Sequence, residues 1–410
     1  MFFFNSKKQL FKNLMAVMKL DGFYLVNQKK INNGHVLTIG IPPYHSFSDI
    51  EKKKENFESY FKGIIEMEQI RFSDKLTMKI ITQDIGFFDF EPVKTKSNEF
   101  YIGKLFDGEN YFIDLNKDPH VLIAGKTGTG KSFLLASILT NLIYNHSNRY
   151  DIYLCQTAKR DIDYLKNCKG IKMNLYTPSE TAMVLEDAAN EIDRRSEFFA
   201  NNGFRGIDHY NSHNKTKKMK RKLYVFEEIS LYMPDDTDSE EEQKDKNKVW
   251  QLIWKIVKLG RESGIHFMGL TQRTTVANLG GNGEIKSQLT RITFAQATEL
   301  DSRNVIDCDL ATKLQNRECY ILGNNGLKLV KVPTIDKGMT ILNKYVPEII
   351  CVNSKNNTTT KGIEFEQVQF THTRIKDNEK SIKLDEKIVK ERQKSNRKHK
   401  KGVSFDDNDW

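Results

Sequence analysis

The chain is poor in cysteine and has no long apolar run, and both absences narrow its class. Five cysteines are scattered over 410 residues without a Cys-x-x-Cys pair. This pattern argues against a disulfide framework and a cysteine-based zinc site, and it suits a reducing compartment. No segment reaches the roughly 18–20 apolar residues of a membrane-spanning helix. We therefore expect a cytoplasmic protein that reaches the inner face of a membrane only through a partner.

The apolar start of the chain is too short for a signal peptide. Met1-Phe2-Phe3-Phe4 is followed at once by Asn5, whereas the apolar region of a secretory signal runs for about 7–15 residues. A core strand and a surface anchor are the two remaining interpretations. We prefer the core strand.

The charge balance suits an anionic partner. Lys and Arg total 64 against 54 Asp and Glu, which gives a formal net charge of +10. Such an excess is compatible with nucleic acid binding, although solubility alone also accounts for it. Part of the excess lies in the basic segment 390–401, which could bind DNA or an acidic membrane surface, or have no ligand.

Three regions differ in pattern. Residues 1–100 mix strand-like and helical segments, which predicts a small α+β domain. Residues 101–345 alternate strands and helices, which predicts an α/β fold with a mostly parallel sheet. Residues 355–410 are polar and hold few large apolar side chains, so we expect a disordered tail.

The element boundaries follow from apolar runs and turn signals. In the first region we expect strands at 22–26, 35–41 and 76–81, and a helix from 49 to about 67 capped by Ser48. In the second we expect a helix at 179–201 and strands at 121–124, 151–155, 223–227, 265–271, 291–296 and 318–323. The basic run 215–222 and the acidic stretch 235–248 are expected to be exposed loops, with binding as the alternative.

The most specific motif lies at residues 121–132, Val-Leu-Ile-Ala-Gly-Lys-Thr-Gly-Thr-Gly-Lys-Ser. It matches the phosphate-loop pattern G-x-x-x-x-G-K-[ST] between a predicted strand and a predicted helix. Backbone N–H groups of such a loop close around phosphates, and the helix N-terminus adds partial positive charge. The expected nucleotide-binding residues are Gly125, Lys126, Thr127, Gly128, Thr129, Gly130, Lys131 and Ser132. The alternative is a glycine-rich turn without a ligand.

Two further strands end in polar side chains that suit the same chemistry. The apolar run 223–226 is followed by Glu227, a candidate Mg²⁺ ligand with Ser132, and by Glu228, which could orient or deprotonate a water. The run 265–271 is followed by Gln272, whose amide could sense the γ-phosphate. Arg261 precedes that strand and could reach the phosphates of a neighbouring subunit. Each of these residues taken alone could be an ordinary surface residue.

The order of these motifs resembles that of the FtsK/SpoIIIE family of DNA-translocating ATPases. The resemblance covers about residues 100–335. The segments that carry it, besides the phosphate loop, are Gly103-Lys104, Asp114-Leu115, Pro119-His120, Glu191–Arg195, Gly203–Asn211, Gly260–His266, Thr271–Arg273, Thr290–Ile292 and Asp301–Asp307.

The resemblance implies a RecA-like motor that binds ATP and Mg²⁺ between the subunits of a hexameric ring. Duplex DNA would pass through the pore and be held by its backbone phosphates. Glu228 would be the catalytic base and Gln272 the sensor. Arg261 is the first choice for the arginine acting in trans, with Arg291 and Arg303 as rivals.

Several departures from the family pattern shape the expected role. Glu227 stands where the family has Asp, 235–248 is an insertion, and no winged-helix or upstream membrane segment is recognised. We therefore expect a motor like the FtsK-type coupling ATPases of Gram-positive conjugative elements. The alternatives are a DNA segregation or packaging motor, a type VII-like protein-secretion ATPase and a nucleotide-dependent recruiter.

Overall fold

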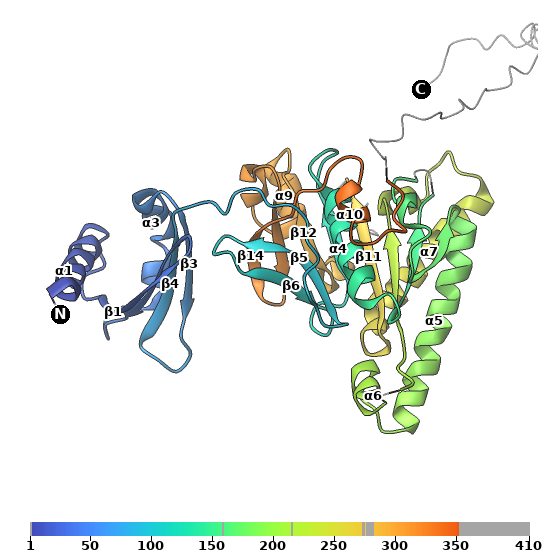
Figure 1. Cartoon of the computed structure of the whole chain (residues 1–410), viewed down its shortest axis with the longest axis horizontal. Coiled ribbons are helices and arrows are strands. Elements are labelled where there is room, and N and C mark those ends of the chain that lie inside the picture. The colour runs from blue at the N-terminus through green and yellow to red at the C-terminus, as the bar shows by residue number, and fades with distance from the viewer. Residues whose placement is uncertain (1, 158–159, 215, 273–274, 276–282, 352–410) are drawn as a thin grey trace, which may run out of the picture. The chain divides into compact units, whose positions relative to one another are not determined.

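The computed structural model describes residues 2–157, 160–214, 216–272, 275 and 283–351. These residues build two β-sheets with their helices (Figure 1). No helix in these ranges is long and apolar enough to cross a membrane. The tail predicted at 355–410 lies outside the described residues, and the predicted domain boundaries stay predictions.

The first sheet is antiparallel and lies near the N-terminus, with the strand order β1-β2-β4-β3. Its strands are β1 (Tyr24–Ile31), β2 (Gly34–Gly40), β3 (Ile64–Gln69) and β4 (Lys75–Ile81). Its helices are α1 (Phe2–Val17), α2 (Phe47–Glu51) and α3 (Lys54–Phe61). Apolar side chains from both layers, among them Met15, Ile39 and Phe57, form one buried core.

Two predictions in this region are wrong. The expected core strand at the start of the chain is helix α1, because Phe11, Leu14 and Met15 continue the apolar pattern at helical spacing and are buried. The expected helix to about residue 67 ends at Phe61. Lys62 there adopts a left-handed conformation (φ +50°), and the following segment becomes β3.

A cap position also differs from the prediction. The first helix after β2 is capped by Ser46 rather than Ser48. The backbone N–H of Ser46 donates to the Asp49 carboxylate at 2.8 Å. This carboxylate in the first turn also suits the helix dipole.

The second sheet has ten strands in the order β6-β5-β14-β13-β12-β7-β11-β10-β8-β9. The strands are β5 (Glu99–Leu105), β6 (Asn110–Asp114), β7 (Val121–Ala124), β8 (Tyr150–Cys155), β9 (Ile171–Leu175), β10 (Arg221–Phe226), β11 (Ile265–Thr271), β12 (Thr290–Thr293), β13 (Glu318–Gly323) and β14 (Gly326–Lys331). The block from β12 to β9 is parallel, while β13, β14, β5 and β6 add antiparallel pairs. The predicted α/β fold is confirmed, and the sheet is mixed.

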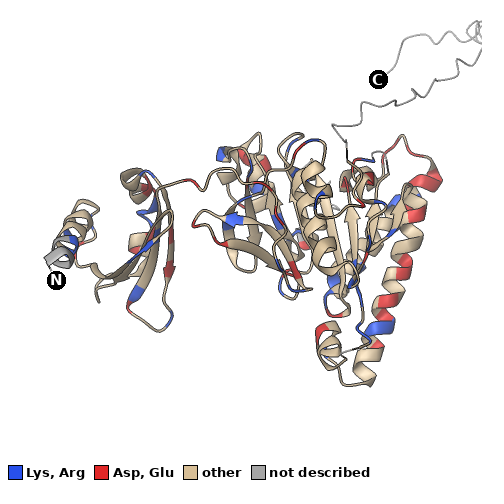
Figure 2. Ribbon diagram, in the orientation of Figure 1, with Lys and Arg blue, Asp and Glu red and all other residues tan. Residues whose placement is uncertain are grey.

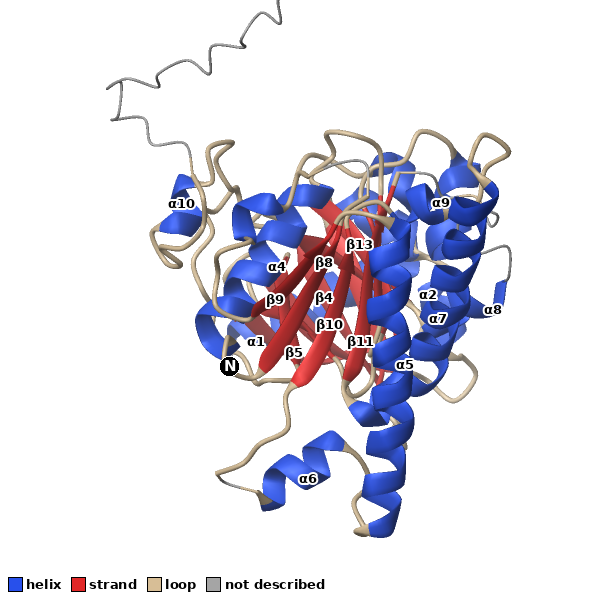
Figure 3. Ribbon diagram, turned by 90° about the vertical axis from the view of Figure 1, so that its right-hand side faces the viewer, coloured by secondary structure: helices blue, strands red, loops and turns tan. Residues whose placement is uncertain are grey.

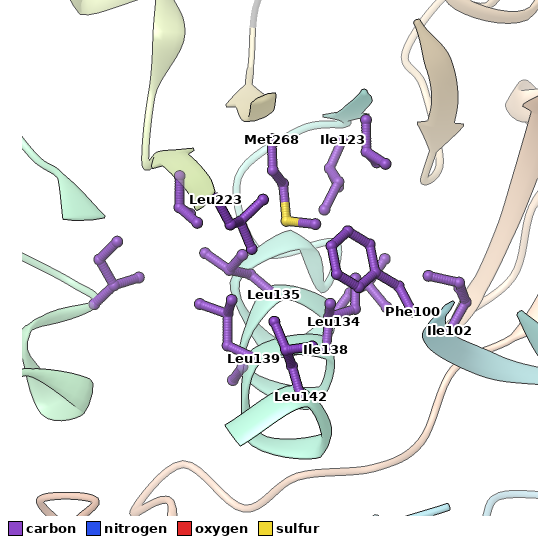
Figure 4. Close-up of a cluster of buried hydrophobic side chains, with 14 of the residues drawn as sticks. Phe100, Ile102, Ile123, Leu134, Leu135, Ile138, Leu139, Leu142, Leu223 and Met268 are labelled. Carbon is purple, nitrogen blue, oxygen red and sulfur yellow. The ribbon is translucent and has the colours of Figure 1, made fainter. Parts of the chain in front are cut away.

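Helices cover both faces of this sheet (Figure 3). They are α4 (Lys131–His146), α5 (Pro178–Asn201), α6 (Ile207–His213), α7 (Glu240–Ser263), α8 (Gly283–Gln288), α9 (Glu299–Ile306) and α10 (Thr340–Asn343). Short 3₁₀ turns lie at Asp163–Leu165, Ile229–Tyr232 and Leu310–Lys313. Helix α4 packs on one face through Leu134, Leu135 and Ile138 (Figure 4), while α5 and α7 pack on the other. The core thus holds β7, and with it the start of α4, at the centre of the sheet.

The two charged segments are loops at 216–220 and 235–239, as predicted, and then continue into regular elements. The second half of 235–248 starts α7, because the Ser239 hydroxyl accepts from the Glu242 N–H (3.2 Å) and three glutamates occupy the first turn (Figure 2). The basic run 215–222 ends inside β10. There Arg221 is only 3% exposed and pairs with Asp208.

Candidate nucleotide-binding site

The phosphate loop connects the buried strand β7 to the first residue of α4. Gly125, Gly128 and Gly130 have φ angles of +150°, +81° and +116°, which side chains other than glycine rarely adopt. A Cβ added at Gly125 would lie 2.9 Å from Phe294 Cβ. Glycine is therefore required both by the backbone and by the close packing on Phe294. The strand, loop and helix expected from the sequence are confirmed.

Lys131 points back into this loop. Its side chain is buried, and Nζ donates to the carbonyl oxygen of Gly125 and, at 3.0 Å, to that of Lys126. The Thr129 hydroxyl donates to the same Lys126 carbonyl at 2.7 Å. The ammonium group therefore lies at the mouth of the loop, where a polyphosphate would bind.

Glu227 and Glu228 follow β10, two strands away from β7. Both are buried, at 9% and 6% exposure. Glu228 Oε1 accepts from the Ser230 hydroxyl at 2.6 Å and from the Gln272 backbone N–H at 3.2 Å. Glu227 Oε1 accepts from the Asp161 backbone N–H at 3.2 Å. The two carboxylates are therefore held by separate partners.

Gln272 connects the carboxylates to the loop. It follows β11, which lies between β7 and β10. Its side-chain Oε1 accepts from the Thr127 hydroxyl at 2.7 Å, while its backbone N–H bonds Glu228. Gln272 therefore links the loop to Glu228, through its side chain on one side and its backbone N–H on the other.

One pocket collects most of the predicted site residues. Its lining residues are Thr127, Gly128, Gly130, Lys131, Ser132, Phe133, Asp161, Glu227, Glu228, Leu270 and Gln272. It opens at the carboxyl edge of the parallel strands, where ligands of open α/β sheets bind. The structure thus places a cation, two carboxylates, an amide and a helix N-terminus around one cavity.

The donor set of this pocket fits Mg²⁺ bound with a nucleotide. Ser132 and Glu227 offer a hydroxyl and a carboxylate, and Mg²⁺ takes oxygen ligands. Within the described ranges no group of three or more His, Cys, Asp or Glu could hold a metal. Mg²⁺ is commonly held by one or two protein groups plus phosphates and waters.

Arg261 lies away from this pocket. It is in the last turn of α7, just before β11 begins, so it lies at the opposite edge of the sheet, roughly 20 Å away along a seven-residue strand. Its side chain is 57% exposed, and its Nε lies 3.8 Å from Glu262. It lines a surface pocket with Arg205 and His209. Arg261 could therefore serve only the site of another copy.

The two rival arginines differ in their contacts. Arg291 donates to the Val305 carbonyl at 2.7 Å and to Asp307 at 2.9 Å, so its guanidinium fastens the end of α9. Arg303 is 58% exposed and lies 3.3 Å from Glu299. Arg291 is thus the less available of the two.

Sequence reasoning missed Asp161. It lies in the segment after β8, lines the pocket and holds Glu227 through its backbone. Strand β8 is parallel to β10 in register. Polar residues after the predicted strand 151–155 could therefore have been placed beside Glu227, because carboxyl ends of parallel strands share one edge.

Comparisons with known proteins agree with this geometry. Residues 90–276 match the FtsK/SpoIIIE family model. DNA translocase FtsK of Caldanaerobacter subterraneus subsp. tengcongensis is 31% identical over 256 residues, 59% of this chain and 33% of that protein. DNA translocase FtsK of Clostridium tetani is 32% identical over 228 residues, 53% of this chain and 29% of that protein. The chain thus spans about a third of the length of these relatives.

A solved structure shows the same fold over a larger share of the chain. The conjugation coupling protein TcpA of pCW3, determined as a monomer with ATPγS, superposes with a TM-score of 0.56 at 17% identity. The match covers 83% of this chain and 98% of that one. Residues 90–276 are thus similar in sequence to the FtsK/SpoIIIE family, as the order of the motifs predicts, and the superposition shows the same fold as this coupling protein.

Proposed function

We propose that this chain is an ATP-driven DNA translocase that moves DNA during conjugative transfer. The observation that carries the proposal is the convergence of Lys131, Ser132, Glu228 and Gln272 on one pocket of an FtsK/SpoIIIE-family domain. The matched relatives are named DNA translocases. Their names support the proposal that this chain uses ATP hydrolysis to move DNA.

The side chains suggest a division of labour in hydrolysis. The loop N–H groups and Lys131 bind and orient the phosphates, and Glu228 positions or deprotonates the attacking water. Gln272 bonds Thr127 in the loop and Glu228, so a change in phosphate occupancy at the loop would alter the position of Glu228. Ser132 and Glu227 would hold Mg²⁺, which would supply positive charge against the phosphates.

Coupling to DNA requires more than one copy. Arg261 lies at the far edge of the sheet from its own pocket, so in a ring it would act on the nucleotide of a neighbour and stabilise transition-state charge. The family resemblance supports a hexamer. DNA would bind through its backbone phosphates, so binding should weaken with salt and show little sequence preference.

Conjugation is preferred over the alternatives because of the extent of the structural match. The superposition covers 98% of the coupling protein's chain and 83% of this chain. At 17% identity this is likeness of fold, so segregation, packaging and type VII-like secretion are the competing roles. Partner proteins of a membrane-bound transfer machine would recruit the chain to the membrane.

The test is ATP hydrolysis by the purified chain with and without long double-stranded DNA. We expect strong DNA stimulation that is lost in Lys131→Ala. Hydrolysis that DNA leaves unchanged, in protein that binds ATP, would contradict the translocase assignment. Stimulation by a secreted protein instead of DNA would favour the secretion role.

A further inference from the structure

Arg317 lies beside the phosphate loop and has no part in the site described above. Its guanidinium carbon lies 4.9 Å from the centre of the Phe133 ring. Phe133 follows Ser132 at the start of α4 and lines the nucleotide pocket. A guanidinium over an aromatic ring is a favourable cation–π arrangement.

The sheet determines why Arg317 reaches this position. Strand β13 runs antiparallel to β12, with Tyr320 opposite Thr293. Residues just before β13 therefore lie at the carboxyl end of β12, next to the loop. Cys319 packs in the core that contains α4, and the contact with Phe133 places Arg317 on the same side of the sheet.

This position is energetically unfavourable without a ligand. Arg317 Nη1 is buried and has no hydrogen-bond partner among the described residues. Burial lowers the pKa of Arg317, because the charged form loses hydration. The backbone φ of +65° is also strained for a residue with a side chain. A flat ligand ring over the guanidinium would offset part of this cost through stacking and cation–π contact.

The direction of a bound nucleotide follows from the order of the strands. Glu228 and Gln272 lie on the β10–β11 side of β7, so the terminal phosphate points to that side. Strands β12 and β13 lie on the other side of β7. A nucleotide with its phosphates in the loop therefore extends its nucleoside half toward Arg317 and Phe133.

We propose that Arg317 and Phe133 form the base subsite of the nucleotide pocket. The purine ring stacks on the face of the Arg317 guanidinium that lies away from the Phe133 ring. The subsite rests on the proposed function, because it presupposes that the loop binds ATP. It assigns Arg317 a role in recognising the nucleoside rather than the phosphates.

The test compares ATP with inorganic tripolyphosphate, which lacks the nucleoside. Calorimetric titration of the full chain and of Arg317→Lys gives a Kd for each. Lysine keeps the charge and removes the planar face, so we expect the Kd for ATP to rise about fivefold to tenfold. The Kd for tripolyphosphate should change less than about twofold, which is within the spread expected for a residue remote from the phosphates.

The control variant removes a similar contact elsewhere. Lys258 Nζ lies 4.6 Å from the centre of the Trp254 ring on α7. This contact is near the end of α7 that leads into the amino end of β11, whereas the phosphate loop is at the carboxyl edge. Lys258→Met should leave both Kd values unchanged. If Arg317→Lys fails to fold, Phe133→Leu provides the same comparison, because it keeps an apolar side chain and removes the ring.

Each other outcome overturns the subsite. Equal weakening of ATP and tripolyphosphate would make Arg317 a phosphate ligand, and no change in either would make it a structural residue. Wild-type protein that binds neither compound would remove the proposed function as well, which separates the failure of the motor from the failure of the subsite.

Discussion

The two edges of the ten-stranded sheet hold buried charges in different ways. At the carboxyl edge, Lys131 and Glu228 are 7% and 6% exposed, yet both line an open pocket. At the amino edge, Arg221 is 3% exposed and is occupied by protein partners, donating to His266 Nε2 at 2.9 Å and pairing with Asp208. Burial of a charge is thus shared by both edges. Of these three residues, Lys131 and Glu228 face a pocket, whereas Arg221 is bound by other protein groups.

The amino edge also contains buried neutral histidines. His266 Nδ1 lies 2.9 Å from the Pro119 carbonyl and His120 Nδ1 accepts from the Phe267 N–H at 3.1 Å. Because Nε2 of His266 accepts from Arg221, its Nδ1 carries the proton and donates to Pro119. Burial lowers the pKa of His120 to about 3 and that of His266 well below its usual value. The two imidazoles connect the starts of β7 and β11 through these hydrogen bonds. Because their pKa values are lowered, both rings are neutral at neutral pH.

The largest expected effect is at the carboxyl edge. Glu228→Gln should lower kcat by about 10²–10⁴-fold, because the amide cannot accept a proton from water. ATP binding should persist, since the loop is untouched. Steady-state hydrolysis and a nucleotide-binding titration measure both. A kcat within tenfold of wild type would assign the base elsewhere.

The next effect is at the amino edge. Arg221→Met should lower the free energy of unfolding by about 2–3 kcal/mol, because it leaves the buried His266 acceptor without its donor. Half-exposed Asp208 regains water, which limits the loss. Urea unfolding gives the value. The Kd for ATP should not change, and a large change in it would break the distinction between the edges.

A pH titration sharpens the same comparison. The pKa of His120 is lower in the folded chain than in the unfolded chain, so the unfolded state binds more protons below about pH 6.5. Stability should therefore be lost as pH falls, by about 2 kcal/mol between pH 6.5 and 5 from this residue. His120→Gln should show a shallower decline in urea unfolding. Equal slopes for both proteins would show that His120 is not the cause.

The smallest effect concerns the acidic start of α7. Ser239→Ala removes the side-chain acceptor for the Glu242 N–H and should cost about 1 kcal/mol. Thermal unfolding detects the change, and Ser239→Asp should restore most of it. Activity should stay at the wild-type level, because this helix end lies outside the pocket.

The sequence predicted which residues gather at one pocket better than it predicted the strands of the sheet. Buried parallel strands such as β7 and β11 are continuous apolar runs, so their positions follow from composition. Strands β6 and β14 are short and part-exposed, and their pairing is decided by contacts distant in sequence. Apart from β13, which was predicted at 318–323, the antiparallel strands of this sheet were therefore missed.

The same limit applies inside the site. Motif spacing located Lys131, Glu228 and Gln272 because local chemistry requires those residue types. Asp161 carries no motif of its own, since it reaches the pocket through the register of β8. Arg317 likewise lies beside Phe133 only through the register of β13. The helical start of α7 was missed for another reason: its acids suggest a loop, although acids at a helix N-terminus are stabilising.

The most direct test of the account is displacement of a triplex-forming oligonucleotide from long duplex DNA by the purified chain. The account predicts displacement that requires ATP and is abolished by Glu228→Gln. Protein that hydrolyses ATP without any displacement, and at a rate independent of DNA, would contradict the claim that this pocket drives movement along DNA.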